Sequence, residues 1–512
     1  MAVLNIIFKI PLSAWGLLIF LLLTSHFLRN RFRPVLYKVP GPFLASLTDF
    51  WRLYDVARGH HHDALIRLHR EYESELVRIG PNTVSVADPE AVKVIYGLNK
   101  GFTKSDFYVV QQAVSQGKPL ENLFNTVRED FHAAIRRPVA HAYSMTTLVQ
   151  FEPFVDTTSQ VFCGRLTELF AGTGRVCDLG KWLQYYAFDV IGEITFSKRF
   201  GFLETGSDIE GIIADLEWRL VYFATCGQVP ILDRLLLKSP LAMRVIPTNH
   251  VVKFTLQYIK ERLAKPEDRK DFLSMFLKAK ELYPDVVTDR QVMSYSVSNV
   301  FAGSDTTAIS LRSVLYYLLK NPRILMKVVG EIDDTVGDRD CSQFPISFNE
   351  SNRMPYFQAV LKEGMRMHPA VGLLLERKVP EKGAIIAGTW LPGGTTIGIN
   401  PWVLHRNKRV FGEDADCFRP ERWLEADQET LRAMDRSFLA FGSGPRTCIG
   451  KNISLLEMAK IIPQLLWTFE FELAEPEEEW KLLDMWFVKQ TNFNVNLKAR
   501  PGRGIVIDSI NP

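Results

Sequence analysis

The sequence predicts a mainly α-helical protein with small β-sheets (class α+β), in which a single large helical domain follows an N-terminal transmembrane helix. Three observations support this prediction. An apolar run near the N-terminus has the length of a membrane-spanning helix. Residues from about 150 to about 370 follow a mostly helical period. Strand-like segments are few, and they lie outside that central stretch.

The first segment, residues 1–35, is predicted to be a membrane anchor. Ile10 to Leu28 is nearly all apolar, and as a helix it would span ~28 Å, close to the thickness of one hydrocarbon core. Three arginines follow directly, and this bias places the rest of the chain in the cytosol. A cleaved signal peptide is the alternative, but no small-x-small cleavage site follows the apolar run.

Residues 36–512 are predicted to form one domain, since no repeat, low-complexity stretch or second linker interrupts them. Pro40-Gly41-Pro42 breaks any helix and would act as a stiff hinge behind the anchor. Leu76 to Val86 alternates and turns at Gly-Pro-Asn, which predicts a β-hairpin. Gly383 to Ile399 contains further strand-like pieces, separated by a Pro-Gly-Gly turn.

One predicted helix is unusually long. Thr288 and Gln291 have the spacing of a capping box at its start. Helical composition then continues to Lys320, where Asn321-Pro322 ends it. About 33 residues would give a helix of ~50 Å, which is long enough to cross the whole domain.

Composition limits the class of partner. Lys plus Arg is 61 and Asp plus Glu is 58, so the net charge is +3 and gives no support for a nucleic-acid-binding protein. The six cysteines form no CxxC pair, so neither a zinc site nor a disulfide framework is indicated. This cysteine pattern suits a reducing compartment.

Within the long helix, residues 302–307 read Ala-Gly-Ser-Asp-Thr-Thr. Gly303 weakens the helix by up to ~1 kcal/mol relative to alanine. Thr306 and Thr307 can bond to carbonyls one turn earlier and bend it. The predicted result is a thin, opened turn in which Asp305 and Thr306 could relay protons. The alternative, helix packing through small residues, remains open.

Glu363 and Arg366 are spaced i and i+3, so they are neighbours on one face of a predicted helix. Arg422, in the stretch Pro-Glu-Arg-Trp, could join them as a third charged partner. An isolated pair of this kind contributes little to stability. We interpret the three residues as structural rather than catalytic.

The ten residues from Phe441 to Gly450 carry the most specific chemistry. Glycines allow the backbone to approach a flat ligand closely and to adopt positive φ. Cys448 can offer a thiolate to a metal, and a thiolate is a strong electron donor. Arg446 can bind a carboxylate beside it. The combination points to an iron porphyrin ligated by cysteine.

Together these segments resemble the cytochrome P450 haem-thiolate monooxygenases over essentially the whole chain after the anchor. Four motifs occur in the order and spacing of that family: AGSDTT, EGMR, PERW and FGSGPRTCIG. KSDFY (residues 104–108) and AYSMTTLVQFEPFVD (residues 142–156) resemble the fungal pisatin demethylase-like branch more narrowly. The resemblance implies the cytochrome P450 fold, with haem b as cofactor.

The resemblance also implies which residues hold the haem. Cys448 matches the axial iron ligand. Arg446, Arg136 and Arg377 match arginines that bind the haem propionates. His132 stands where the family's WxxxR motif has tryptophan, and it can still donate a hydrogen bond to a propionate. Phe441 and Gly442, at the start of the ligand loop, are counted among the cofactor-binding residues.

The remaining matched positions have other roles. Asp305 and Thr306 match an acid–alcohol pair that delivers protons to dioxygen. Glu363, Arg366 and Arg422 match a salt-bridged triad behind the haem. The substrate side would be lined by residues 101–126, 298–306 and 371–375 and by residues near Phe487. These segments are apolar enough for a lipophilic substrate, although core packing would explain the same composition.

The implied function is oxidation of a lipophilic small molecule with O2 and two electrons from NADPH, passed on by a separate NADPH-cytochrome reductase. Fungal secondary metabolite biosynthesis is the expected setting, in the endoplasmic reticulum membrane with a single-pass anchor and a cytosolic catalytic domain. One alternative is a haem-thiolate isomerase or dehydratase that needs no external electrons. Others are a detoxifying demethylase of a plant defence compound and a non-catalytic haem sensor.

Overall fold

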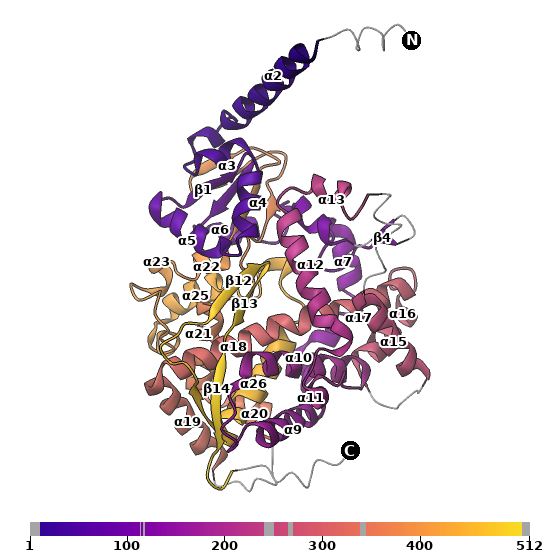
Figure 1. The fold of residues 1–512 in the computed structure, drawn as a ribbon, viewed down its shortest axis with the longest axis vertical. Helices are drawn as coiled ribbons and strands as arrows, with labels where there is room; N and C mark the ends of the chain where they lie inside the picture. Colours follow the sequence, from indigo (N-terminus) through magenta and orange to yellow (C-terminus); the bar gives the residue numbers. More distant parts are fainter. Residues whose placement is uncertain are drawn as a thin grey trace.

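The computed structural model describes residues 11–112, 114–115, 118–239, 250–264, 270–337 and 345–503. The predictions made for residues 1–10 and for Cys341 therefore lie outside the described residues. Figure 1 shows a helix-rich body with small sheets, which confirms the predicted mainly α-helical domain with small β-sheets. Helix α2 (Leu12–Arg31) projects from one end of this body.

The first part of the chain runs from the end of the body next to α2 to the opposite end (Figure 1). Its helices are α3 (Phe43–Leu47), α4 (Phe50–Ala57), α5 (His61–Glu71), α6 (Ala91–Ile95), α7 (Glu129–Arg136), α8 (Met145–Leu148) and α9 (Glu152–Leu169). The central part contains α10 (Leu179–Phe196), α11 (Phe202–Thr205), α12 (Ile212–Cys226), α13 (Ile231–Leu235), α15 (His250–Ala264), α16 (Phe272–Leu282), α17 (Asp289–Gly303), α18 (Asp305–Lys320) and α19 (Pro322–Val336).

The last part returns across the body and carries the segments of greatest functional interest. Its helices are α20 (Phe348–Asn352), α21 (Pro355–Met367), α22 (Pro401–Leu404), α23 (Lys408–Phe411), α24 (Arg422–Glu425), α25 (Gln428–Ser437) and α26 (Lys451–Thr468). The 3-10 turns are η1 (Leu36–Lys38), η2 (Asp106–Gln111), η3 (Ala140–Tyr143), η4 (Val149–Phe151), η5 (Ile209–Gly211) and η7 (Gly444–Arg446).

The strands are short and form separate small sheets. They are β1 (Leu76–Gly80), β2 (Thr83–Val86), β3 (Thr103–Lys104), β4 (Val114–Ser115), β5 (Lys118–Pro119), β6 (Cys177–Asp178), β7 (Arg377–Lys378), β8 (Ala384–Ile386), β9 (Thr389–Leu391), β10 (Thr396–Ile399), β11 (Phe469–Leu473), β12 (Lys481–Met485), β13 (Phe487–Thr491) and β14 (Asn494–Ala499).

The five-stranded sheet has the order β1-β2-β10-β7-β3. β1 and β2 pair antiparallel, with Leu76 opposite Val86, so the predicted hairpin is confirmed. The predicted strand pieces between residues 383 and 399 are confirmed as β8, β9 and β10. The sheet joins residues 76–86 to residues 377–399, because β10 runs parallel to β2.

The long central helix forms where the sequence predicts it, but it is interrupted. α17 ends at Gly303 and α18 begins at Asp305, with Ser304 between them at φ −81° and ψ −62°. The predicted capping box is wrong, since the Thr288 side chain makes no cap hydrogen bond. The first-turn N–H of Gln291 is bonded instead to the Thr288 carbonyl oxygen at 2.9 Å.

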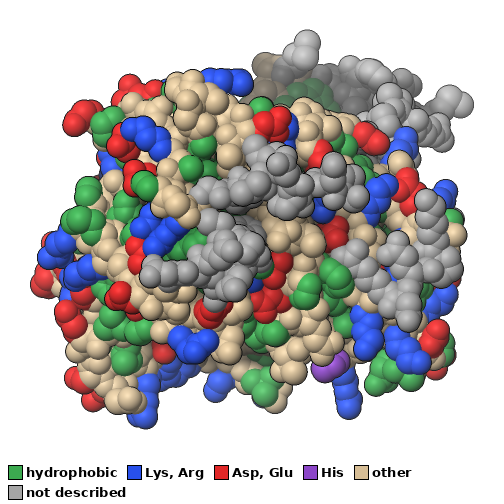
Figure 2. All heavy atoms as spheres, turned by 90° about the horizontal axis from the view of Figure 1, so that it is seen from below, with side chains coloured by type: hydrophobic (Ala, Val, Ile, Leu, Met, Phe, Trp, Pro, Cys, Tyr) green, Lys and Arg blue, Asp and Glu red, His purple; other side chains and the backbone are tan. Residues whose placement is uncertain are grey.

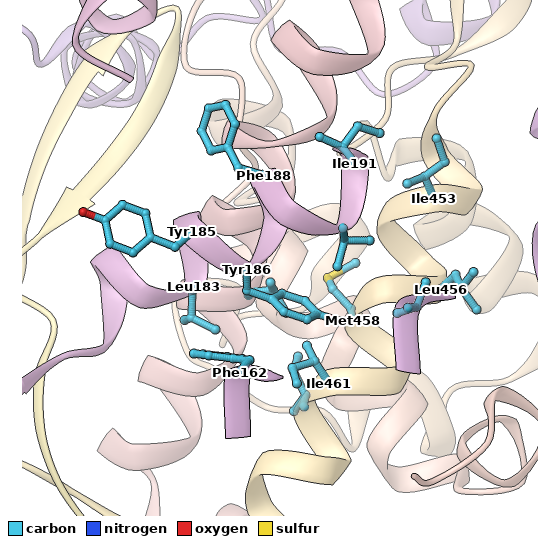
Figure 3. Packing of buried hydrophobic residues seen from close by; sticks show 14 of the residues in the cluster. Phe162, Leu183, Tyr185, Tyr186, Phe188, Ile191, Ile453, Leu456, Met458 and Ile461 are labelled. Atoms are coloured by element: carbon cyan, nitrogen blue, oxygen red, sulfur yellow. The ribbon is translucent and has the colours of Figure 1, made fainter. Parts of the chain in front are cut away.

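The core of the body lies where α9, α10 and α26 pack against one another. Figure 3 shows Phe162 from α9, Tyr186 and Ile191 from α10, and Met458 and Ile461 from α26 pointing into one cluster. These side chains are at most 1% exposed. α18 packs on α10, α21 and α26, so the interrupted helix crosses directly beside this core.

The N-terminal helix is tied to the hairpin by a buried arginine. Arg78, 1% exposed in β1, donates to the carbonyl oxygens of Asn30 (2.5 Å) and Arg31 (3.0 Å) at the end of α2. The Arg78 N–H donates in turn to Pro40 at 2.7 Å. The predicted hinge at residues 40–42 is thus packed against β1. Within the described part of the chain, no helix combines the length and the apolar character needed to cross a membrane.

Charged side chains are mixed rather than grouped on the end of the molecule opposite α2. Figure 2 shows this face, where blue Lys and Arg and red Asp and Glu are interspersed. The mixture follows from the nearly equal numbers of basic (61) and acidic (58) residues in the chain.

Candidate functional site

Cys448 lies in the loop between α25 and α26, two residues before Gly450, which precedes α26. Its N–H donates to the Phe441 carbonyl oxygen at 2.9 Å, which closes the loop. Gly442 and Gly444 both adopt positive φ (68° and 69°), a backbone conformation that glycine tolerates best. The loop therefore needs the glycines that the sequence places there.

The environment of the Cys448 thiol is both enclosed and accessible. The residue has an exposed surface, yet burial raises the pKa of its thiol, against backbone N–H groups of Gly450 and Lys451 that lower it. Both observations hold if the sulfur faces a hollow inside the protein. The N–H groups also lie at the first turn of α26, where the helix dipole favours a thiolate.

The interrupted helix lies next to the same loop. The Thr307 hydroxyl at the start of α18 and the Ser454 hydroxyl at the start of α26 are 2.8 Å apart. Ala302, five residues before Thr307, is exposed although most of α17 and α18 is not. A Cβ atom added to Gly442 would meet no atom within 4 Å. Open space therefore borders both the cysteine loop and the helix break.

Five basic side chains from four segments gather beside this loop: Lys104, His132, Arg136, Arg377 and Arg446. Burial and then the charges of Arg446, Arg136, Lys104 and Arg377 lower the pKa of His132 to about 3. Burial, followed by Arg377 and Arg446, likewise lowers the pKa of Lys104. The arginine charges of this cluster repel one another in a buried place and require anionic partners.

Some of these cations have partners within the chain. Arg446 forms a two-point ion pair with Glu129, with Nε–Oε2 and Nη2–Oε1 distances of 2.9 Å. Arg136 Nη1 donates to the Thr447 carbonyl oxygen at 3.0 Å. Arg377 Nη1 donates to the carbonyl of Glu376 at 2.8 Å. One carboxylate does not balance the cluster, so the residues fit a bound group with two carboxylates, such as the haem propionates.

Asp305 and Thr306 are adjacent in the chain, but their side chains have different partners. The Asp305 carboxylate accepts a hydrogen bond from the Gln184 amide of α10. The Thr306 hydroxyl donates to the Ala302 carbonyl oxygen at 2.7 Å, as the sequence predicts. The same prediction for Thr307 is wrong, because its hydroxyl pairs with Ser454 across to α26.

The partners of Asp305 form a polar chain inside the protein. Gln184 Oε1 accepts from Arg312 Nη2 at 3.1 Å, and Arg312 Nε donates to the Gly180 carbonyl oxygen at 2.8 Å. Burial raises the pKa of Asp305, while the charges of Lys489 and Arg312 and the Gln184 bond oppose that rise. A carboxyl whose pKa is raised by burial holds a proton more readily than an exposed aspartate, which suits a group that passes protons on.

Gly303 supports the packing interpretation of the small residues. A Cβ atom at Gly303 would lie 2.9 Å from Cδ1 of Ile191, so the glycine lets α10 approach α17 closely. Ala302 faces open space instead. The small residues therefore have two roles: Gly303 admits a neighbouring helix, and Ala302 borders the hollow.

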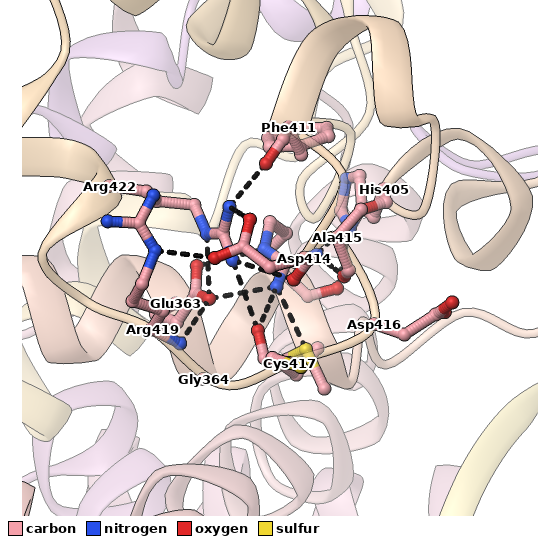
Figure 4. Close-up of polar contacts among 12 residues, drawn as sticks. Glu363, Gly364, His405, Phe411, Asp414, Ala415, Asp416, Cys417, Arg419 and Arg422 are labelled. Carbon is pink, nitrogen blue, oxygen red and sulfur yellow. Dashed lines mark hydrogen bonds and ion pairs between the residues drawn. The ribbon is translucent and has the colours of Figure 1, made fainter.

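Glu363, Arg366 and Arg422 form a buried network. Figure 4 shows Glu363 and Arg422 with the polar contacts around them. Arg366 binds Glu363 through two bonds of 2.8 Å, and Arg422 Nε lies 3.0 Å from Glu363 Oε1. Two further donors were not anticipated: the Trp423 indole at 2.9 Å and the Arg419 N–H at 2.8 Å. Burial opposes ionisation of Glu363, but these bonds and charges outweigh it and lower its pKa.

An aromatic cluster lies on the other predicted wall of the site. Phe107 and Trp486 have ring centroids 5.1 Å apart. The backbones of Val371 and Phe487 pair in an isolated antiparallel β-bridge. Trp486 sits at the tip of the β12–β13 hairpin with φ 75° and is 3% exposed. Three of the predicted substrate-side segments, 101–126, 371–375 and the region of Phe487, therefore meet.

Lys104, Gln184 and Trp423 belong to the site but were not predicted to have these roles. Lys104 lies within the quoted KSDFY segment, and its ammonium group is 4.0 Å from the Tyr108 ring centroid. Trp423 is the last residue of the PERW motif, which gives no indication of its contact with Glu363. Gln184 gives no local signal, since its partner Asp305 is 121 residues away.

Comparison with known proteins adds to this geometry. A family model described as Cytochrome P450 matches residues 40–497. The cytochrome P450 monooxygenase cicH of Emericella nidulans is 45% identical, with 93% of this chain and 96% of the relative covered. A cytochrome P450 monooxygenase of Aspergillus terreus is 41% identical over 89% and 94% of the two chains. Pisatin demethylase of Fusarium vanettenii is 37% identical over 95% and 92%.

Proposed function

The chain belongs to the cytochrome P450 family and is a haem-thiolate monooxygenase, and on that premise we propose that it oxidises a lipophilic small molecule with electrons that a separate reductase passes from NADPH. The observation that carries this proposal is the accessible Cys448 thiol inside the protein. Such a thiol can ligate iron on one side of a hollow whose other side admits a substrate.

The chain's own residues would hold and orient the haem. Cys448 would ligate the iron, and the cluster of basic side chains would bind the two propionates. Gly442 leaves open space at the ligand loop, and Gly444 lets the loop pack directly on the Tyr96 carbonyl. When bound, haem supplies the activation of O2, with the thiolate donating electron density that favours O–O cleavage.

Asp305 and Thr306 would supply protons. The Thr306 hydroxyl lies at the helix break beside the exposed Ala302, which places it at the edge of the hollow. Asp305 is held by Gln184, away from Thr306. Proton transfer between them therefore requires either a bridging water or a rotation of the carboxyl group.

The substrate is proposed to be apolar or aromatic, because Phe107, Tyr108, Trp486 and Phe487 form an apolar cluster beside the site. Fungal secondary metabolite biosynthesis is the proposed setting, since the similar monooxygenases come from fungi. One of these relatives is named pisatin demethylase. That name favours oxidative demethylation, in defence against a plant compound, as the second candidate reaction.

We also infer that residues 1–35 anchor the enzyme in the endoplasmic reticulum membrane and leave the catalytic domain in the cytosol. Two observations support this proposal. Helix α2 projects from the body (Figure 1). Its large apolar residues are exposed to solvent, with exposed fractions of 59% for Leu17, 64% for Phe20 and 61% for Leu22. Carbonate extraction of fungal microsomes tests it: full-length protein should stay in the pellet, and removal of residues 1–35 should release it.

Turnover with and without NADPH and a fungal reductase tests the proposed reaction. Candidate lipophilic compounds are offered to the purified enzyme, and product and NADPH consumption are measured together. A monooxygenase requires both NADPH and reductase and forms product in proportion to NADPH. Turnover that is independent of both would instead identify an isomerase or dehydratase.

A further inference from the structure

His405 lies between the Glu363–Arg366 ion pair and the segment that leads to Cys448. It follows α22 directly, and its side chain is fully buried (0% exposed). The imidazole Nδ1 is 3.0 Å from the Arg366 carbonyl oxygen, and Nε2 is 2.7 Å from the Leu439 backbone nitrogen. The His405 carbonyl oxygen also accepts from Arg366 Nη1 at 2.7 Å.

These contacts fix the protonation state of the imidazole. The carbonyl of Arg366 can only accept, so Nδ1 must carry a hydrogen. The N–H of Leu439 can only donate, so Nε2 must be a bare acceptor. A second proton would set two N–H groups against each other. Burial and the charge of Arg366 lower the pKa of His405 to about 3, in agreement with this neutral form.

The Leu439 N–H begins a short series of contacts that ends at the cysteine. The Leu439 carbonyl oxygen accepts from the Gly442 N–H at 2.9 Å. The Phe441 carbonyl oxygen, between them in sequence, accepts from the Cys448 N–H at 2.9 Å. The imidazole also stacks on Phe438, with ring centroids 5.4 Å apart and planes 5° apart. The segment 438–442 is therefore held from the His405 side.

We propose that His405 is a positioning residue for the iron ligand: its rigid ring joins the backbone of Arg366 to the Leu439 N–H and so fixes where the Cys448 sulfur stands. The Glu363–Arg366 network supplies the rigid side of this connection. A thiolate that is held in place keeps its bond to iron when protons compete for it. The proposal rests on the assignment of Cys448 as the ligand, which substitution of that cysteine tests separately.

Two substitutions separate the two ends of the connection. In His405→Gln, the longer amide reaches the position of Nε2 and can accept from the Leu439 N–H. In His405→Asn, the shorter amide reaches only the position of Nδ1 and can donate to the Arg366 carbonyl. If the Leu439 contact positions the ligand, the bond between the Cys448 thiolate and iron should resist acid normally in the glutamine variant. In the asparagine variant it should resist acid less well.

The measured quantity is the long-wavelength absorption band that carbon monoxide gives with thiolate-ligated ferrous haem. The haem-loaded full chain is titrated toward acid, and far-ultraviolet circular dichroism is recorded in the same samples. In His405→Asn the band should disappear at a pH about 1 unit higher than in the natural chain, while the helical signal is retained. In His405→Gln the midpoint should stay within about 0.3 units of the natural one.

His368 offers a matched control. It is also buried (1% exposed), and its Nε2 bonds a backbone group, the Val488 carbonyl oxygen, at 2.8 Å. None of its described contacts reaches the ligand segment. In His368→Asn the band should disappear only together with the helical signal.

A purely structural role for His405 predicts a different pattern. The band in His405→Asn would then be lost only with the helical signal, as in His368→Asn, or the asparagine and glutamine variants would behave alike. Either result would overturn the proposal. Phe438→Leu provides a second route if His405→Asn does not fold, since it frees the ring without removing either hydrogen bond. Phe438→Leu should raise the pH midpoint at which the carbon monoxide band disappears, by less than His405→Asn does. An unchanged midpoint in Phe438→Leu would also count against the proposal.

Discussion

The Gln184 amide donates a hydrogen bond to the Asp305 carboxylate, across from α10 to the first residue of α18. Thr306, the next residue after Asp305, is bonded elsewhere, to Ala302. The acid and the alcohol of the proposed proton pair are therefore positioned separately. Gln184, held by Arg312, determines where the acid lies.

Replacing Gln184 by leucine tests this dependence. The Asp305 carboxylate would lose its amide donor. The pKa of the buried carboxyl would therefore rise further, and proton transfer would slow. We expect product formation to fall on the order of 10-fold and the solvent isotope effect on it to grow. Gln464→Leu, at a buried glutamine of α26, is the control and should lower stability alone. An unchanged isotope effect in Gln184→Leu would contradict the role of Gln184.

Thr306→Ala should uncouple NADPH consumption from product formation. Loss of the hydroxyl at the edge of the hollow removes a proton donor, so reduced oxygen should leave as peroxide. Thr307→Ala is the matched control, because its hydroxyl contacts Ser454 and should cost only ~1 kcal/mol of stability. Peroxide and product are measured per NADPH. Equal coupling in the two variants would exclude Thr306 from the proton path.

Arg366→Leu should destabilise the enzyme severely. It would leave the buried Glu363 carboxylate without its two-point partner, at an expected cost of about 3–5 kcal/mol in the free energy of unfolding. Arg419→Ala removes only side-chain contacts that are 39% exposed and should cost less than about 1 kcal/mol. Urea unfolding of the haem-loaded protein compares the two. If Arg366→Leu lowered the free energy of unfolding as little as Arg419→Ala does, the stabilising role of the network would be contradicted.

Acid should destabilise the fold through its buried neutral histidines. His368 and His405 each have a pKa lowered to about 3, by burial first, whereas an unfolded histidine titrates near its ordinary value of 6.5. Their contribution to stability is thus complete above pH 6.5 and is lost as the pH falls toward 3. Each should contribute a slope of roughly 1.4 kcal/mol per pH unit in that window. Removing His368 should reduce the slope, which urea unfolding at several pH values measures; an identical slope would contradict this.

The parts of the site that could be predicted are local in sequence. The Phe441–Gly450 loop combines its glycines, arginine and cysteine within ten residues, and the 76–86 hairpin carries its own turn. The Glu363–Arg366 pair follows from helical spacing alone. The propionate roles of Arg136, Arg377 and Arg446 stay predictions, as does the membrane anchor.

What could not be predicted depends on packing between distant segments. Trp423 donates to Glu363 across 60 residues of sequence, and Thr307 faces Ser454 across 147 residues. Periodicity places a residue on a face of its helix, but it does not identify the neighbouring helix. The missing capping bond at Thr288 shows the same limit, since a matching motif does not guarantee the side-chain contact.

The carbon monoxide difference spectrum of cysteine variants tests the central claim most directly. Cys448→Ser should abolish the long-wavelength band of thiolate-ligated ferrous haem, because serine offers no thiolate. Cys417→Ser, at the exposed cysteine next to the Arg366 network, should keep the band in full. An unchanged band in Cys448→Ser, or its loss in Cys417→Ser alone, would contradict the assignment of Cys448 as the iron ligand.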